Sequence, residues 1–193
     1  MSVWERAALG PRGAVEATGA STGGRETARV ARKLRQVERL RFGPDDPRTV
    51  VSQMDRLAAA HDGWINLVPW TAGEEEPETS LGFFTLLGGD RANVTMCTWI
   101  PAKDEGRAQG MEHLGITHGA GSRARAELSS QGIALGASWF VEQDHPRRGL
   151  VVRIPAGEPH AELLGWTLRA VAALSGPVPP PRWIAEVHLP TSS

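Results

Sequence analysis

Two short segments of this sequence carry residue types that could bind an anion and move a proton. The first is the Gly-rich stretch Thr117–Arg123, which opens a predicted helix, and the second is the turn Asp144–Gly149. Free backbone N–H groups at a helix N-terminus attract negative charge, and glycines let a ligand approach the backbone. Arginine offers a planar fork to carboxylate or phosphate, and histidine can exchange a proton near neutral pH. The candidate ligand-binding residues are His118, Gly119, Gly121, Ser122, Arg123, Asp144, His145, Arg147 and Arg148.

The Gly-rich segment also matches a dinucleotide-binding motif, and both segments have a further interpretation as simple turns that need no ligand. Gly119–Ala124 matches the dinucleotide-binding pattern G-x-G-x-x-A, and Glu142 and Asp144 follow at roughly the distance expected for the ribose-binding acid. However, residues 112–116 make a poor buried strand, and a hairpin follows where a dinucleotide fold needs another crossover helix. A tight turn into a helix is therefore the favoured interpretation. In the second segment, Asp and Pro can shape the turn, Gly can close it, and the arginines can keep its tip in solvent.

Histidine and cysteine show no metal-binding spacing. The six histidines include no HxH or HExxH pair, and Cys97 is the only cysteine. A metal site would need distant loops to bring His118, Asp144 and His145 together, and we predict neither a metal nor a cofactor. No G-x-S-x-G motif supports a serine nucleophile. Cys97 lies in a predicted strand, and we expect it to be a packed thiol.

The elements that must position these residues alternate as strand, helix, strand, strand, helix, strand over residues 93–189. This β-α-β-β-α-β order is typical of a ferredoxin-like α+β sandwich. A helix over 47–61, a short strand over 64–69 and a strand over 83–87 precede it, and the last of these forms a hairpin with the next strand. The six predicted elements are strand 94–100, helix 122–131, strand 138–144, strand 150–154, helix 159–174 and strand 183–189.

The helix over 47–61 has clear boundary signals. Asp46 is its expected N-cap, Pro47 its first residue, and Asp62-Gly63 its end. The buried face predicted from the helical period consists of Val50, Val51, Met54, Leu57, Ala58 and His61.

The predicted topology places three loops at one end of the domain. The helix over 122–131 must start where strand 94–100 finishes, and the turn 145–149 and the linker 175–182 return to that end. We expect the linker to bring Arg182 to the candidate residues there. An anionic small molecule is the ligand that such groups favour.

Composition divides the chain into four parts. Residues 1–24 are rich in small and polar residues without periodicity and are predicted to be disordered. Residues 25–45 are predicted to be a basic helical arm, residues 46–190 a single α+β domain, and residues 191–193 a tail. The apolar stripe of the arm consists of Val30, Leu34, Val37 and Leu40.

The charge and hydropathy of the chain exclude several classes of partner. The net charge is −1, so nothing draws the whole protein to nucleic acid or to an anionic membrane. No apolar run approaches the ~20 residues that span a bilayer, and Met1–Arg6 lacks the apolar core of a signal peptide. We therefore expect a cytoplasmic protein without a membrane partner. Only two of the 21 basic residues are lysines, Lys33 and Lys103, which with abundant Ala, Gly and Pro indicates a GC-rich bacterial genome.

No motif names a reaction, so the functional predictions are classes. We predict a ligand-binding or protein-interaction module without catalysis. Two alternatives stay open. One is a small-molecule enzyme acting on an anionic substrate at the end that carries His118 and His145, and the other is a nucleic-acid-associated protein that uses its basic arm. A homodimer formed through an exposed sheet edge is consistent with the predicted fold.

Overall fold

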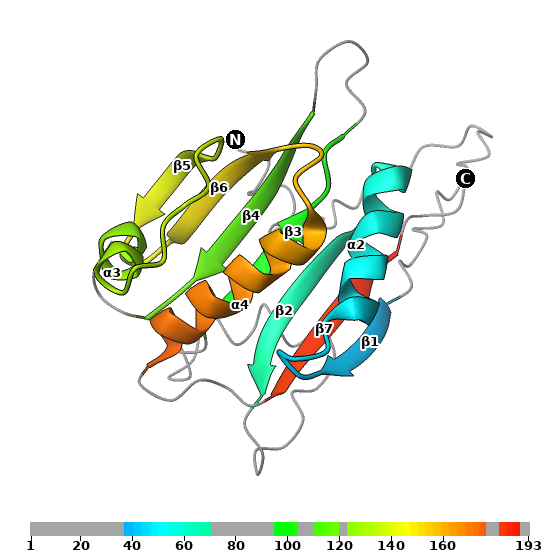
Figure 1. Cartoon of the computed structure of the whole chain (residues 1–193), viewed down its shortest axis with the longest axis horizontal. Helices are drawn as coiled ribbons and strands as arrows, with labels where there is room; N and C mark the ends of the chain where they lie inside the picture. The colour runs from blue at the N-terminus through cyan, green and yellow to red at the C-terminus, as the bar shows by residue number, and fades with distance from the viewer. Residues whose placement is uncertain (1–36, 71–94, 104–109, 120–122, 177–181, 190–193) are drawn as a thin grey trace, which may run out of the picture. The chain divides into compact units, whose positions relative to one another are not determined.

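A seven-stranded antiparallel sheet and three helices make up the described part of the chain (Figure 1). The computed structural model describes residues 37–70, 95–103, 110–119, 123–176 and 182–189. This arrangement confirms the predicted α+β class. In chain order the elements are β1 (Val37–Phe42), α2 (Arg48–Ala60), β2 (Trp64–Trp70), β3 (Met96–Ile100), β4 (Met111–Thr117), α3 (Ala124–Ser130), β5 (Phe140–His145), β6 (Gly149–Pro155), α4 (His160–Ser175) and β7 (Arg182–His188).

The order of strands in the sheet differs from the ferredoxin-like prediction. The strands lie in the order β1-β7-β2-β3-β4-β6-β5, so β2 and β3 separate β4 from β7. The strand that precedes α3 is β4, which contains residues 112–116, the segment that we predicted to make a poor buried strand. The apolar pattern of this strand is interrupted by Glu112, His113 and Gly115. Because the buried position 112 carries a carboxylate, the alternation of apolar and polar residues that indicates a strand cannot be recognised in the sequence. Strand β6 lies between β4 and the edge strand β5.

The three helices lie on one face of the sheet and form a single core with it. Figure 1 shows α2 and α4 on this face, and α3 packs against β5, β6 and α4. Alternate strand residues point into the core, as Leu67, Cys97 and Ile116 do in neighbouring register positions. Helix α4 has the most extensive buried surface, which consists of Leu163, Leu164, Trp166, Thr167, Leu168, Ala170, Val171 and Leu174. Each large apolar side chain buried in this way stabilises the fold by roughly 1.5–3 kcal/mol.

Strand β1 corrects the described part of the predicted basic helical arm over residues 25–45. Val37–Phe42 pairs antiparallel with β7 along its whole length, and Leu40 and Phe42 pack against the core. From Arg39 to Phe42 basic and apolar residues alternate, and this alternation fits a strand, whereas Val37 and Leu40 also fit a helical stripe. Residues 25–36 of the predicted arm lie outside the described residues, as does the predicted strand 83–87.

Helix α2 buries Val50, Met54 and Leu57 as its period predicts. Its expected cap is different, because the Asp46 carboxylate accepts a hydrogen bond from Arg48 Nε at 2.9 Å and makes no cap bond. The helix ends at His61, which adopts a left-handed conformation with φ of 50°. This turn leaves His61 exposed instead of buried. None of the helices in the described ranges is long and apolar enough to cross a membrane.

Candidate functional site

The predicted site residues that the structure describes do share one end of the sheet, which we call the His118 end. Ile116 of β4 pairs with Leu150 of β6, and Leu150 pairs with Asp144 of β5, so the segments after Thr117 and around His145 lie side by side. Arg182 begins β7 at the same end, opposite Trp70. Strand β3 begins at this end instead of finishing there, because β4 carries the chain back before α3. Gly121 and Ser122 lie outside the described residues.

The turn at the His118 end is built by its own hydrogen bonds. His145 Nδ1 accepts the backbone N–H groups of Arg147 at 3.1 Å and Arg148 at 3.3 Å. Gly149 adopts a φ of +84°, and a Cβ atom there would lie 2.1 Å from the backbone oxygen of Ile116. Both arginine side chains are exposed. These contacts support the interpretation of the segment as a tight turn.

His118 and Asp144 are the unsatisfied polar pair at this end. His118 is 7% exposed, and neither of its ring nitrogens has a hydrogen-bond partner in the described ranges. Burial lowers the pKa of the imidazole, and the nearby Asp144 charge opposes this shift. Oδ1 of Asp144 is also buried without a partner among the described residues. A neutral imidazole beside an unpaired carboxylate oxygen does not favour an anion, so the pair itself gives the anion prediction little support.

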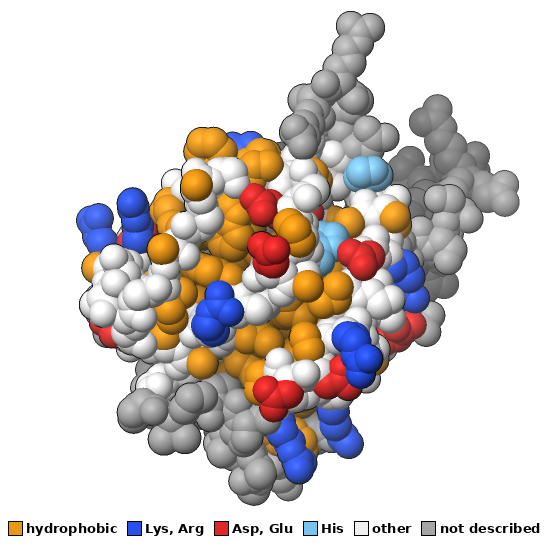
Figure 2. Space-filling view, in the orientation of Figure 1, with side chains coloured by type: hydrophobic (Ala, Val, Ile, Leu, Met, Phe, Trp, Pro, Cys, Tyr) orange, Lys and Arg blue, Asp and Glu red, His pale blue; other side chains and the backbone are white. Residues whose placement is uncertain are grey.

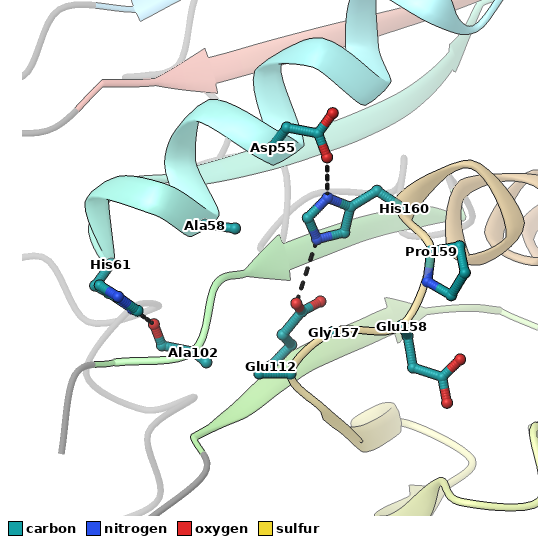
Figure 3. Close-up of a pocket in the computed structure, with 10 residues that line it drawn as sticks. Asp55, Ala58, His61, Ala102, Glu112, Gly157, Glu158, Pro159 and His160 are labelled. Atoms are coloured by element: carbon teal, nitrogen blue, oxygen red, sulfur yellow. Dashed lines mark hydrogen bonds and ion pairs between the residues drawn. The ribbon is translucent and has the colours of Figure 1, made fainter. Parts of the chain in front are cut away.

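A second site, which the sequence did not reveal, lies where α2 ends and α4 begins (Figure 3). A cavity of about 360 Å³ opens there, and we call it the α2–α4 pocket. Figure 2 shows histidine and acidic side chains together over these helix ends. The described residues that line the pocket are Asp55, Ala58, His61, Ala102, Glu112, Ala156, Gly157, Glu158, Pro159 and His160.

His160 lies between two carboxylates in this pocket. Its Nδ1 is 2.6 Å from Oδ1 of Asp55 in α2, and its Nε2 is 3.3 Å from Oε1 of Glu112 in β4. The Asp55 side chain is 65% exposed, whereas that of Glu112 is 3% exposed. The imidazole therefore connects a carboxylate at the surface to one in the core.

Trp99 holds the buried end of this arrangement. Its indole Nε1 donates a hydrogen bond of 2.8 Å to Oε2 of Glu112, so both oxygens of that carboxylate have a partner. The Trp99 and His160 rings also meet edge to face, with centroids 5.3 Å apart and an interplanar angle of 77°. Trp99 is fully buried in the middle of the sheet, so it fixes Glu112 against a rigid support.

The geometry favours a positive charge on His160. A neutral imidazole has one donor nitrogen, and only the imidazolium can donate to Asp55 and Glu112 together. The pKa of His160 is raised, first by the hydrogen bond to Glu112 and then by the contact with Asp55, while burial opposes both. Glu112 has the larger effect although its contact is longer, because charges interact more strongly away from water. The first turn of a helix disfavours a cation, so the two carboxylates must also overcome that dipole.

The rest of the pocket wall is acidic or neutral. His61 Nδ1 donates to the Ala102 carbonyl oxygen at 3.0 Å, which leaves Nε2 of a neutral ring as an acceptor. Glu158 accepts a hydrogen bond from Ser138 Oγ at 2.6 Å, and Figure 3 shows its carboxylate pointing away from His160. No lysine or arginine occurs among the described lining residues. With His160 protonated, the described lining residues carry three carboxylates and one imidazolium, so the pocket is negative overall.

The sequence held no local signal for this site. Asp55 and His160 are 105 positions apart, and Glu112 and His160 are 48 apart. The only trace is Glu112 itself, an acidic residue inside an otherwise strand-like run. Within the described ranges, no group of three or more His, Cys, Asp or Glu residues could hold a metal ion, so His118, Asp144 and His145 do not form such a group. Cys97 is fully buried as expected, and burial raises the pKa of its thiol.

Comparison of the chain with protein-family models, with curated proteins and with solved structures finds no match. The geometry of the α2–α4 pocket and of the His118 end therefore carries the functional argument.

Proposed function

We propose that this protein is a small-molecule-binding module and that its ligand is a compact organic cation held in the α2–α4 pocket. The observation that carries the proposal is the Asp55 carboxylate. It is 65% exposed, it lines the pocket, and one of its oxygens is held by His160 at 2.6 Å. An oriented carboxylate, in a wall whose described residues include no lysine or arginine, offers an ammonium or guanidinium group a charge-assisted hydrogen bond.

The volume of the pocket limits the size of the ligand. Small-molecule sites usually occupy 300–1,000 Å³, roughly, and this pocket lies near the lower bound at about 360 Å³. The apolar part of the wall comes from small side chains, those of Ala58, Ala102, Ala156 and Pro159. A cation with a short apolar body fits these conditions better than an extended or aromatic one.

The same geometry favours binding over catalysis. A histidine that acts as a general base needs a ring nitrogen within reach of the substrate proton. Both ring nitrogens of His160 already contact carboxylates. In the unliganded pocket His160 therefore orients Asp55, and a reaction would first require it to release one of its partners.

The proposal is tested by thermal unfolding with a panel of small ions at constant ionic strength. Methylguanidinium and ethanolammonium should raise the melting temperature in proportion to the logarithm of their concentration, and acetate should not. Asp55→Asn should abolish the rise. Glu162→Gln is the matched control, because it removes an exposed carboxylate from the first turn of α4 that does not line the pocket. An equal response in the two variants, or a larger response to acetate, contradicts the proposal.

A further inference from the structure

We propose that the α2–α4 pocket exchanges a proton for its ligand, so that a cation bound at Asp55 and a proton on Nδ1 of His160 exclude one another. This inference rests on the proposed function, because it concerns how the same pocket responds to the same class of ligand. It follows from the positions of three groups: an accessible carboxylate, a buried carboxylate, and the imidazole that contacts both.

Asp55 is the one partner of His160 that a ligand can reach. Its side chain is 65% exposed, whereas Glu112 is 3% exposed and has its second oxygen bonded to Trp99. A cation that enters the pocket therefore competes with the Nδ1 proton of His160 for the Asp55 carboxylate. Two positive charges at one carboxylate repel each other over a few ångströms, and this repulsion is strong where water is partly excluded.

Loss of the Nδ1 proton resolves this competition without disturbing the buried contact. The neutral ring keeps its Nε2 proton and continues to donate to Glu112, 3.3 Å away. Nδ1 then presents a lone pair to the pocket, next to the carboxylate that it previously bonded. An ammonium or guanidinium group has several N–H donors, so it can bond to Asp55 and to Nδ1 together. The proton leaves to solvent, and the charge of the pocket is the same before and after the exchange.

The other groups around His160 do not offer the same exchange. On α2, the remaining titratable group at the pocket is His61, whose Nδ1 is bonded to the Ala102 carbonyl. On β4 the facing group is Glu112, and on β3 it is the neutral indole of Trp99. Around the start of α4, Glu158 is bonded to Ser138 and Glu162 lies outside the pocket wall. His160 is thus the group whose proton occupies the position that the ligand needs.

The exchange predicts a defined pH dependence of affinity. Below the pKa of His160, each unit of decreasing pH should weaken binding about tenfold, because one proton must be released per cation bound. Above that pKa the affinity should be constant. Methylguanidinium is a suitable probe because a guanidinium stays protonated at every pH at which His160 titrates.

The test is titration calorimetry with methylguanidinium from about pH 6 to about pH 9, in buffers of different ionisation enthalpy. The wild-type protein should release up to one proton per bound cation at the acid end and none at the alkaline end. His160→Gln keeps an N–H donor for Glu112 but cannot titrate, so it should bind with pH-independent affinity and no proton release.

Each outcome has a separate meaning. Binding without proton release in the wild type overturns the exchange and leaves the proposed function intact, whereas absence of binding throughout overturns both. Proton release that persists in His160→Gln assigns the proton to another group and also overturns the exchange. If His160→Gln does not fold, NMR titration of the His160 ring in the wild-type protein tests the exchange instead. Saturating methylguanidinium must lower the pKa of this ring, and an unchanged titration overturns the inference.

Discussion

His160, the first residue of α4, lies with its Nδ1 2.6 Å from Oδ1 of Asp55 in α2, a residue 105 positions earlier in the chain. The contact joins the two helices at the mouth of the pocket. Through Nε2 the same ring reaches Glu112, so a surface carboxylate, an imidazolium and a buried carboxylate form one connected group. The stability and titration of the protein should both report on this group.

Replacing Glu112 with Gln should destabilise the protein and lower the pKa of His160. The variant keeps the shape of the side chain but removes the buried negative charge that contributes most to the raised pKa. We expect a loss of about 1–3 kcal/mol in the free energy of unfolding, as for a buried group deprived of a charged partner. Urea denaturation and NMR titration of His160 measure the two effects. Glu162→Gln should change the free energy of unfolding by no more than about 0.5 kcal/mol, and it should shift the pKa of His160 by no more than the equivalent of that energy.

Stability should decline as the pH rises through the pKa of His160. This pKa is raised above the ordinary value of 6.5, so the folded state binds the proton more tightly than the unfolded state does. The resulting stabilisation is complete below pH 6.5 and is lost as His160 deprotonates at higher pH. Urea denaturation across this range should show the decline in the wild type and its absence in His160→Gln. A decline of equal size in that variant would assign the effect to another group.

The contribution of His118 to stability should have the opposite pH dependence, with stability lost as the pH falls. Burial lowers its pKa below 6.5, so the unfolded state binds the proton more tightly than the folded state. Its contribution is therefore constant above pH 6.5, and stability is lost as the pH falls below that value. His118→Gln should reduce this acid sensitivity while leaving the alkaline decline from His160 in place. Denaturation curves for the two single variants separate the two histidines.

Gly149→Ala should be much more destabilising than Gly132→Ala. Both glycines have positive φ, +84° and +73°, so each alanine incurs roughly 1–2 kcal/mol of backbone strain. At Gly149 the new Cβ would also meet the backbone oxygen of Ile116 at 2.1 Å, whereas nothing lies within 4 Å of the Cβ position at Gly132. The β4–β6 pairing would have to shift to accommodate it. Equal midpoints of denaturation for the two variants would show that this close approach is absent.

Several elements could be predicted from the sequence because short-range pattern decides them. The apolar period places Val50, Met54 and Leu57 on one face of α2, and the same argument finds α4 and its end near Gly176. Turn chemistry locates the reversal between β5 and β6. The segments near His118 and His145 lie at one end of the sheet, but strand 94–100 was predicted to finish at that end, whereas β3 begins there.

Only the tertiary structure decided the identity of β1 and β4, the order of the sheet, and the α2–α4 pocket. Residues 37–42 fit a strand or a helix locally, and their pairing with β7 resolves the choice. Glu112 is improbable inside a strand until Trp99 and His160 supply its hydrogen bonds. The cost of burying a carboxylate is offset only by partners that arrive from elsewhere in the chain. A site made of such partners has no local spacing, and for this reason Asp55, Glu112 and His160 could be recognised together only after the chain had folded.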